Sequence, residues 1–196
     1  INEALELIHL PKYAYFKQEI AEIVSFLLAR LDIKTTPIGA EIIPGLELYG
    51  CYTREEVFTL VGRQTAEVKM QGAASGAFNL PEHNAVLLFV TLNKSEKDFS
   101  PSTQYNDYLI NDEYFHWQSK NTDSHYNSGG RKYIEQPKTG IKIILFVREK
   151  KKDGFGNTSP FHCFGLVDYI SSHGDCPMNV KWKLHKPAMA QYSKAI

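Results

Sequence analysis

The sequence lacks several features that would assign it to a functional class directly. Its 196 residues contain 22 basic and 22 acidic side chains, so no overall positive field indicates a nucleic-acid-binding protein. Any nucleic-acid site must therefore be local. No apolar run is long enough to span a bilayer, and no signal peptide or low-complexity tract is evident. We therefore expect a globular protein without membrane contact, located in the cytoplasm.

Cysteine is also scarce. The chain has three cysteines, Cys51, Cys163 and Cys176. An odd number without a CxxC pair argues against a disulfide framework and a structural zinc site. His162 and His173 lie near two of these cysteines, but zinc ligands usually come as closely spaced pairs on tight turns. We therefore predict no metal and no cofactor in this chain, and a reducing compartment fits the cysteine content best.

No established catalytic pattern is visible. Residue spacing shows no Ser-His-Asp or Cys-His constellation, and no phosphate-binding glycine loop is present. Asp107 or Asp112 upstream of Lys120 loosely imitates magnesium-dependent restriction nucleases, in which two carboxylates hold the ion near a lysine. Here the second group near the lysine is an amide. We therefore expect no catalytic residue, and a magnesium-dependent nuclease stays an alternative.

The apolar pattern divides the chain into two regions. Residues 12–31 carry an apolar stripe at helical spacing, which predicts an amphipathic helix that either docks on a neighbouring domain or covers this domain's own core. The prolines and glycines of residues 35–45 are typical of a linker. We therefore assign 1–45 to the helix and linker and 46–196 to a second domain. Because the first residue is Ile1 rather than Met, we expect a piece of a longer chain.

The second domain reads as strands separated by glycine- and aspartate-bearing turns. Residues 85–92 and 141–149 are continuous apolar runs, typical of strands buried on both faces. Residues 178–184 alternate between apolar and polar side chains. Thr53 and Glu56 form a capping box that predicts one short helix. These features predict a mainly β domain with a largely antiparallel sheet curled into a barrel or sandwich.

Two polar stretches interrupt this pattern. Residues 118–131 follow a strand-like segment and are dense in amides, hydroxyls and cations, and residues 63–79 form a second polar arm. Gln, Asn, Arg and Lys have the donor and acceptor geometry that matches base edges and phosphates. The residues therefore indicate nucleic acid as the first partner to consider, although a solvated hairpin loop has the same composition.

An ordered set of motifs gives the chain a resemblance to a known family. The motifs, between about residues 46 and 184, are YTREEV, FVTLNK, YNDYL, FHWQSKN, LFVRE and PMNVKWKL. They resemble the domain often found at the C-terminus of DEAD-box-like helicases and of phospholipase-D-type restriction enzymes. The chain looks most like the DNA-recognition domain of ATP-dependent restriction endonucleases of the NgoAVII and CglI kind, which have the pseudobarrel fold of plant B-three transcription factors.

The resemblance implies a seven-stranded open pseudobarrel with short flanking helices, preceded by the N-terminal amphipathic helix. It implies sequence-specific binding of double-stranded DNA in the major groove by an N-arm within Arg63–Asn79 and a C-arm within Trp117–Arg131. The parent protein would be a restriction endonuclease, with a nuclease domain in the same chain and an ATP-dependent helicase-like subunit or domain as partner. The fragment itself would not be an enzyme.

The residues and the resemblance together give the expected contacts. The expected base-contacting residues are Gln71, Gln118, Ser119, Lys120, Asn121, Asn127 and Arg131. The expected phosphate-contacting residues are Arg54, Arg63, Lys69, Lys94, Arg148, Lys150, Lys151 and Lys152. Trp117 is expected to pack in the core beneath the C-arm.

Two further alternatives stay open beside the nuclease. Related domains in modification-dependent enzymes read methylated cytosine, and a cage for a flipped base would need convergent rings, for which Phe78, Tyr105 and Tyr126 are candidates. A structural domain that docks on a helicase would bind through helix 12–31 instead of DNA.

Overall fold

The chain divides into two compact units, Ile1–Thr35 and Thr36–Ile196. The computed structural model describes residues 43–65, 76–94 and 105–193, together with Gln18, Glu19, Glu22 and Ile38. In the first unit, Gln18, Glu19 and Glu22 have a helical backbone. Gln18 Nε2 donates a hydrogen bond of 3.0 Å to Glu22 Oε1. The rest of the predicted helix 12–31 lies outside the described residues.

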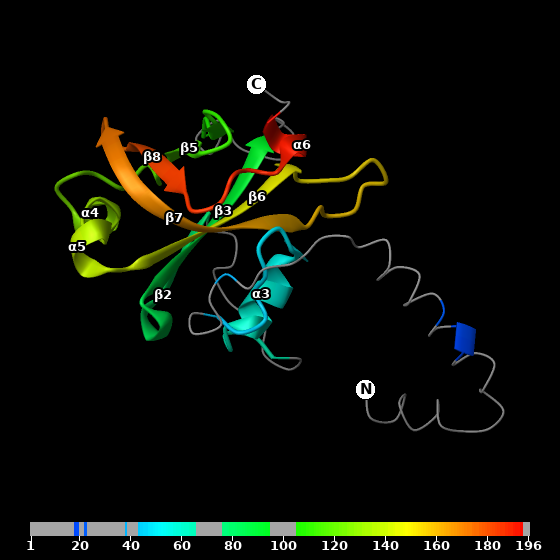
Figure 1. Cartoon of the computed structure of the whole chain (residues 1–196). Helices are drawn as coiled ribbons and strands as arrows, with labels where there is room; N and C mark the ends of the chain where they lie inside the picture. The colour runs from blue at the N-terminus through cyan, green and yellow to red at the C-terminus, as the bar shows by residue number, and fades with distance from the viewer. Residues whose placement is uncertain are drawn as a thin grey trace. The chain divides into compact units, whose positions relative to one another are not determined.

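The second unit is built on one open sheet of eight strands, as counted over the described residues (Figure 1). The strands are β1 (Cys51–Tyr52), β2 (Ala77–Leu80), β3 (Ala85–Asn93), β4 (Tyr108–Leu109), β5 (Tyr114–Gln118), β6 (Lys142–Lys150), β7 (Phe161–His173) and β8 (Asn179–Leu184). Their order is β2-β3-β6-β7-β8-β5-β4, and β1 pairs with β7. Neighbours are antiparallel except β3 and β6, which are parallel.

The predicted mainly β class is therefore confirmed, and the sheet is open rather than closed into a barrel. It has one strand more than the seven that we expected. The two shortest strands, β1 and β4, have 2 residues each. Two residues are too few to show an alternating apolar pattern, so the sequence did not indicate them as strands.

The helices within the described residues are all short. They are α3 (Arg54–Leu60), the 3-10 helix η2 (Pro81–His83), α4 (Ser128–Ile134), α5 (Gln136–Thr139) and α6 (Ala190–Ser193). The predicted capping box is confirmed, because Thr53 Oγ1 accepts from the Glu56 N–H at 3.2 Å and Glu56 Oε2 accepts from the Thr53 N–H at 2.7 Å. No helix in this part of the chain has the length and apolarity needed to cross a membrane.

The apolar side chains of β3 alternate between two clusters. Val86, Leu88 and Val90 belong to the cluster that contains Trp117, whereas Leu87 and Phe89 belong to a second cluster beneath α3. The central strands are thus buried on both faces, as their continuous apolar runs predicted. Trp117 is 4% exposed, and its ring centroid lies 5.0 Å from that of Tyr133 and 6.2 Å from that of Trp182. Its predicted place in the core is confirmed.

Candidate nucleic-acid interface

The described residues enclose a cavity of about 630 Å³ where several elements end. Its walls come from the carboxyl ends of β3, β5 and β6 and from the amino ends of α3 and β7. The parallel pairing of β3 and β6 brings the ends of these two strands together, with Thr91 opposite Arg148. The residues that follow β5, Ser119 and Lys120, add the start of the C-arm to the wall.

The cavity concentrates positive charge in a chain whose total charge is balanced. Its wall contains five cationic side chains and two acidic ones. The cations are Arg54, Lys94, Lys120, Arg148 and Lys151, and the acids are Glu55 and Asp107. A concave, partly apolar surface focuses the field of such a cluster. Among the described residues, this wall therefore has an excess of positive charge, although Asp107 neutralises Lys94.

Two guanidinium groups share one aromatic ring in this cavity. Arg54 Cζ lies 5.4 Å from the centroid of Phe161 and 4.7 Å from that of Phe89, and Arg148 Cζ lies 4.2 Å from the centroid of Phe161. Arg148 is held by hydrogen bonds from Nε to Thr91 Oγ1 (2.9 Å) and from Nη1 to the Ser159 carbonyl (3.0 Å).

The closeness of these cations has an electrostatic cost. Burial, and then repulsion by Arg148, lowers the pKa of Arg54 to about 10, so its side chain remains charged at neutral pH. A phosphate bound near both groups would relieve this repulsion and form charge-assisted hydrogen bonds. The arrangement therefore suits an anionic ligand.

A buried ion pair forms another part of the wall. Lys94 Nζ lies 2.6 Å from Asp107 Oδ2 and donates to the Tyr105 carbonyl at 2.6 Å, and both charged side chains are less than a tenth exposed. The second carboxylate oxygen, Oδ1, accepts from the Gln118 N–H at 2.8 Å. Burial raises the pKa of Asp107, while the Lys94 ammonium opposes that rise.

Gln118 is fixed at the end of β5. Its Oε1 accepts from the Asn106 N–H at 2.6 Å and its Nε2 donates to Asn179 Oδ1 at 3.0 Å. A side-chain amide has two N–H groups and two lone pairs, so one of each remains for a ligand. Lys120 and Asn121 follow Gln118 and are exposed. Gln118, Lys120 and Asn121, all expected to contact bases, therefore lie next to Ser119 at the start of the C-arm.

Three further expected base-contacting residues, Ser119, Asn127 and Arg131, make hydrogen bonds within the chain. Ser119 is fully buried, and its hydroxyl accepts from the Met178 N–H (3.0 Å) and donates to the Lys120 carbonyl (3.2 Å). Asn127 caps α4 by accepting from the Gly130 N–H at 3.0 Å. Arg131 Nε donates to Glu135 Oε1 at 3.0 Å. Gln71 lies outside the described residues.

The expected phosphate-contacting residues separate into two groups. Arg54, Lys94, Arg148 and Lys151 are brought together in the cavity. Arg63 instead pairs with Glu82 through Nε and Oε1 at 2.7 Å, and Lys150 and Lys152 line a different depression beside Tyr192. Lys69 lies outside the described residues.

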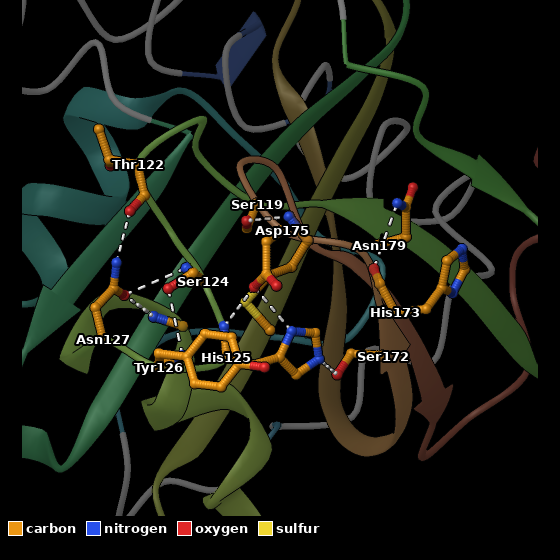
Figure 2. A network of polar contacts seen from close by, with 12 residues as sticks. Ser119, Thr122, Ser124, His125, Tyr126, Asn127, Ser172, His173, Asp175 and Asn179 are labelled. Atoms are coloured by element: carbon orange, nitrogen blue, oxygen red, sulfur yellow. Dashed lines mark hydrogen bonds and ion pairs between the residues drawn. The ribbon is translucent and has the colours of Figure 1, made fainter.

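The residue spacing did not reveal a polar network on the C-arm, which Figure 2 shows. His125 Nε2 lies 2.8 Å from Ser172 Oγ, and His125 Nδ1 lies 2.9 Å from Asp175 Oδ1. Asp175 Oδ1 also accepts from the His125 N–H at 2.7 Å, and Tyr169 Oη lies 2.8 Å from Ser172 Oγ.

This connectivity is that of a hydrolase triad, but its surroundings differ. The Asp175 side chain is 40% exposed, whereas the aspartate of a triad is buried, and none of the three residues lines the large cavity. We therefore interpret the network as an anchor that holds the C-arm against the turn between β7 and β8. No group of three or more metal-ligating side chains occurs among the residues that the structure describes.

Comparison with known proteins gives one family. Residues 46–194 match the family model described as a domain of unknown function (DUF3427). No curated protein matches the sequence. Because the family model covers well over half of the chain, the chain belongs to the DUF3427 family.

Proposed function

We propose that this chain is a sequence-specific double-stranded DNA-binding module that serves as the target-recognition domain of a restriction endonuclease. The observation that carries the proposal is the convergence of five cationic side chains on one cavity bordered by the C-arm, in a chain without net charge. Phosphate contacts by such a cluster give affinity and orientation, while neighbouring amides supply sequence information.

The proposal divides the work between two sets of residues. Arg54, Arg148 and Lys151 bind backbone phosphates, because they are cationic and line the cavity. Gln118, Lys120 and Asn121 contact base edges, because they are exposed or partly exposed at the start of the C-arm. Good bidentate contacts from such side chains discriminate between bases by about 1–3 kcal/mol each.

The nuclease and the helicase-like partner of this proposal belong to the parent protein, and DNA cleavage would occur outside this fragment. The alternative of a magnesium site at Asp107 is less favoured, because both of its carboxylate oxygens already accept hydrogen bonds, from Lys94 and from Gln118. The Lys94 ammonium at 2.6 Å also neutralises this carboxylate, which weakens its attraction for a divalent cation. A reader of methylated cytosine remains the alternative within the same class.

A salt titration of duplex binding tests the proposal. Fluorescence anisotropy with a labelled duplex, without divalent metal, should show affinity that falls steeply as salt rises. Lys151→Ala should weaken binding to every sequence alike and reduce the salt slope by about 1. Lys138→Ala is the matched control, because Lys138 is exposed on α5 and does not line the cavity. Absence of binding by the unmodified chain, or equal effects of both variants, would contradict the proposal.

A further inference from the structure

The cavity has the size of a small-ligand site rather than of a duplex groove. Its volume of about 630 Å³ lies within the range of roughly 300–1,000 Å³ that is typical of pockets that enclose small molecules. A duplex lying across the cavity would leave it largely empty, whereas a single nucleotide would enter it.

Flat surfaces for a base line this cavity. Phe89, Trp117 and Phe161 line the cavity but are only 5%, 4% and 1% exposed, and the guanidinium groups of Arg54 and Arg148 lie over Phe89 and Phe161. The flat surfaces offered to a base are therefore these two guanidinium planes and the half-buried ring of Tyr105. Unpaired bases stack on aromatic rings and on arginine planes with little dependence on sequence. The same guanidinium groups provide the charge for the phosphate of the stacked nucleotide.

The cavity also offers a polar edge. The Lys94–Asp107 pair is buried at the wall, although the burial of two charges is costly unless they are paired and hydrogen-bonded. The Asp107 carboxylate accepts two of the roughly four hydrogen bonds that such a group can accept. The Asp107 carboxylate can accept a further hydrogen bond, and the second side-chain N–H of Gln118 can donate one. This acceptor and donor lie side by side and match the hydrogen-bonding edge of an unpaired base.

An exposed aromatic side chain stands on the hairpin that forms one wall. Phe155 is 93% exposed in the turn between β6 and β7, which projects from the sheet in Figure 1. Asp153 Oδ1 accepts from the N–H groups of Phe155 (2.9 Å) and Asn157 (2.8 Å), so the turn is preformed. Lys151 and Thr158 of the same hairpin line the cavity. Apolar side chains presented in this way act as wedges between base steps.

We propose that the chain extrudes one nucleotide from its bound duplex into this cavity, and that Phe155 inserts into the stack beside the vacated position. This inference rests on the proposed DNA binding. The duplex loses the stacking and pairing of one base, and the Tyr105 ring, the Asp107–Gln118 edge and the two arginines replace those contacts.

The first test compares two duplexes that differ at one base pair. Extrusion costs least where a base is already unpaired. The unmodified chain should therefore bind a duplex with a single central mismatch about tenfold or more tightly than the matched duplex of the same sequence. In the matched duplex, 2-aminopurine at the extruded position should increase several-fold in fluorescence when the chain binds, because it leaves the stack.

Two variants locate the effect. Thr158→Trp places a bulky ring at an exposed position of the cavity wall without changing any charge, and it should abolish both the mismatch preference and the fluorescence increase. Phe155→Ala should weaken binding to the matched duplex more than to the mismatched one. Ile170→Ala is the control, because Ile170 is a 45% exposed apolar residue of β7 that does not line the cavity.

The outcomes separate this inference from the proposed function. Salt-dependent binding to the matched duplex with no mismatch preference and no fluorescence increase overturns the extrusion alone. Failure to bind any duplex overturns both proposals. If Phe155→Ala leaves DNA binding unchanged but abolishes binding to anionic phospholipid vesicles, Phe155 serves a lipid surface and the wedge is wrong.

Discussion

The Lys94 ammonium and the Asp107 carboxylate form an ion pair of 2.6 Å in which the side chains are 8% and 4% exposed. The pair joins the end of β3 to the segment before β4, and through the Gln118 N–H it reaches the start of the C-arm. It is therefore both a structural tie and part of the cavity wall.

Removing one member of this pair should destabilise the fold strongly. Asp107→Asn leaves the Lys94 charge buried without compensation, and we expect a loss of about 3–5 kcal/mol in the free energy of unfolding. Urea denaturation measures this loss. The double variant Lys94→Met, Asp107→Leu should recover much of it, because neither charge then remains buried. A double variant as unstable as Asp107→Asn would contradict this account, because the loss could then not come from the unpaired Lys94 charge.

The start of the C-arm should carry sequence preference. Gln118→Ala and Asn121→Ala should each flatten the preference among duplex sequences by about 1–3 kcal/mol per lost bidentate contact. Competition binding with a set of single-base variants of the preferred duplex measures this effect. Lys138→Ala is again the control, because Lys138 is exposed on α5 outside the cavity wall. A uniform loss on every sequence would assign Gln118 and Asn121 to the phosphates instead.

A glycine in α4 should resist substitution. A Cβ on Gly130 would overlap the Ser124 carbonyl and the Met178 sulfur, so the C-arm would have to move away from the β7–β8 turn. We expect Gly130→Ala to cost about 1–3 kcal/mol, as overpacking in a well-packed core does. Gly154→Ala is the matched control, since a Cβ there meets nothing within 4 Å. Equal thermal stabilities of the two variants would contradict this account of α4.

The anchor of the C-arm should depend on pH. Hydrogen bonds from the His125 N–H and ring lower the pKa of Asp175. A carboxyl group whose folded pKa is depressed contributes stability above its unfolded pKa of about 3.9, and the contribution is lost as pH falls through the folded value. We therefore expect hydrogen-exchange protection of the His125 amide to decrease below about pH 4.

Asp175→Asn isolates this effect. The variant should have low protection of the His125 amide already at neutral pH and should show little further change on acidification. Asp112→Asn is the control, because Asp112 is exposed and lies away from this network. Acid sensitivity of the His125 amide that persists in Asp175→Asn would assign the dependence to another group.

Local features of the fold were predictable from the sequence. The runs at 85–92 and 141–149 predicted strands buried on both faces, because continuous apolar segments bury both sides of a sheet. The capping box of Thr53 and Glu56 predicted α3, because its two hydrogen bonds join residues three apart. These signals are short-range, so the sequence shows them directly.

Other features depend on contacts between distant residues. Helix α4 begins with Ser128, Gly129 and Gly130, which have low helix propensity and were read as a loop; the Asn127 cap and tight packing of Gly130 favour the helix. His125 and Ser172 are 47 residues apart, and no spacing rule joins them. The sequence also indicated which cationic residues could contact phosphate. Only the sheet topology shows which of them line the cavity and that Arg63, Lys150 and Lys152 do not.

Selection from a randomised duplex library, without divalent metal and at moderate salt, in parallel with a cytosine-methylated copy of the library, tests sequence-specific binding directly. We expect enrichment of one short motif in the unmethylated library. Enrichment only in the methylated copy would replace sequence recognition by recognition of a modified base. Enrichment in neither library would contradict the account.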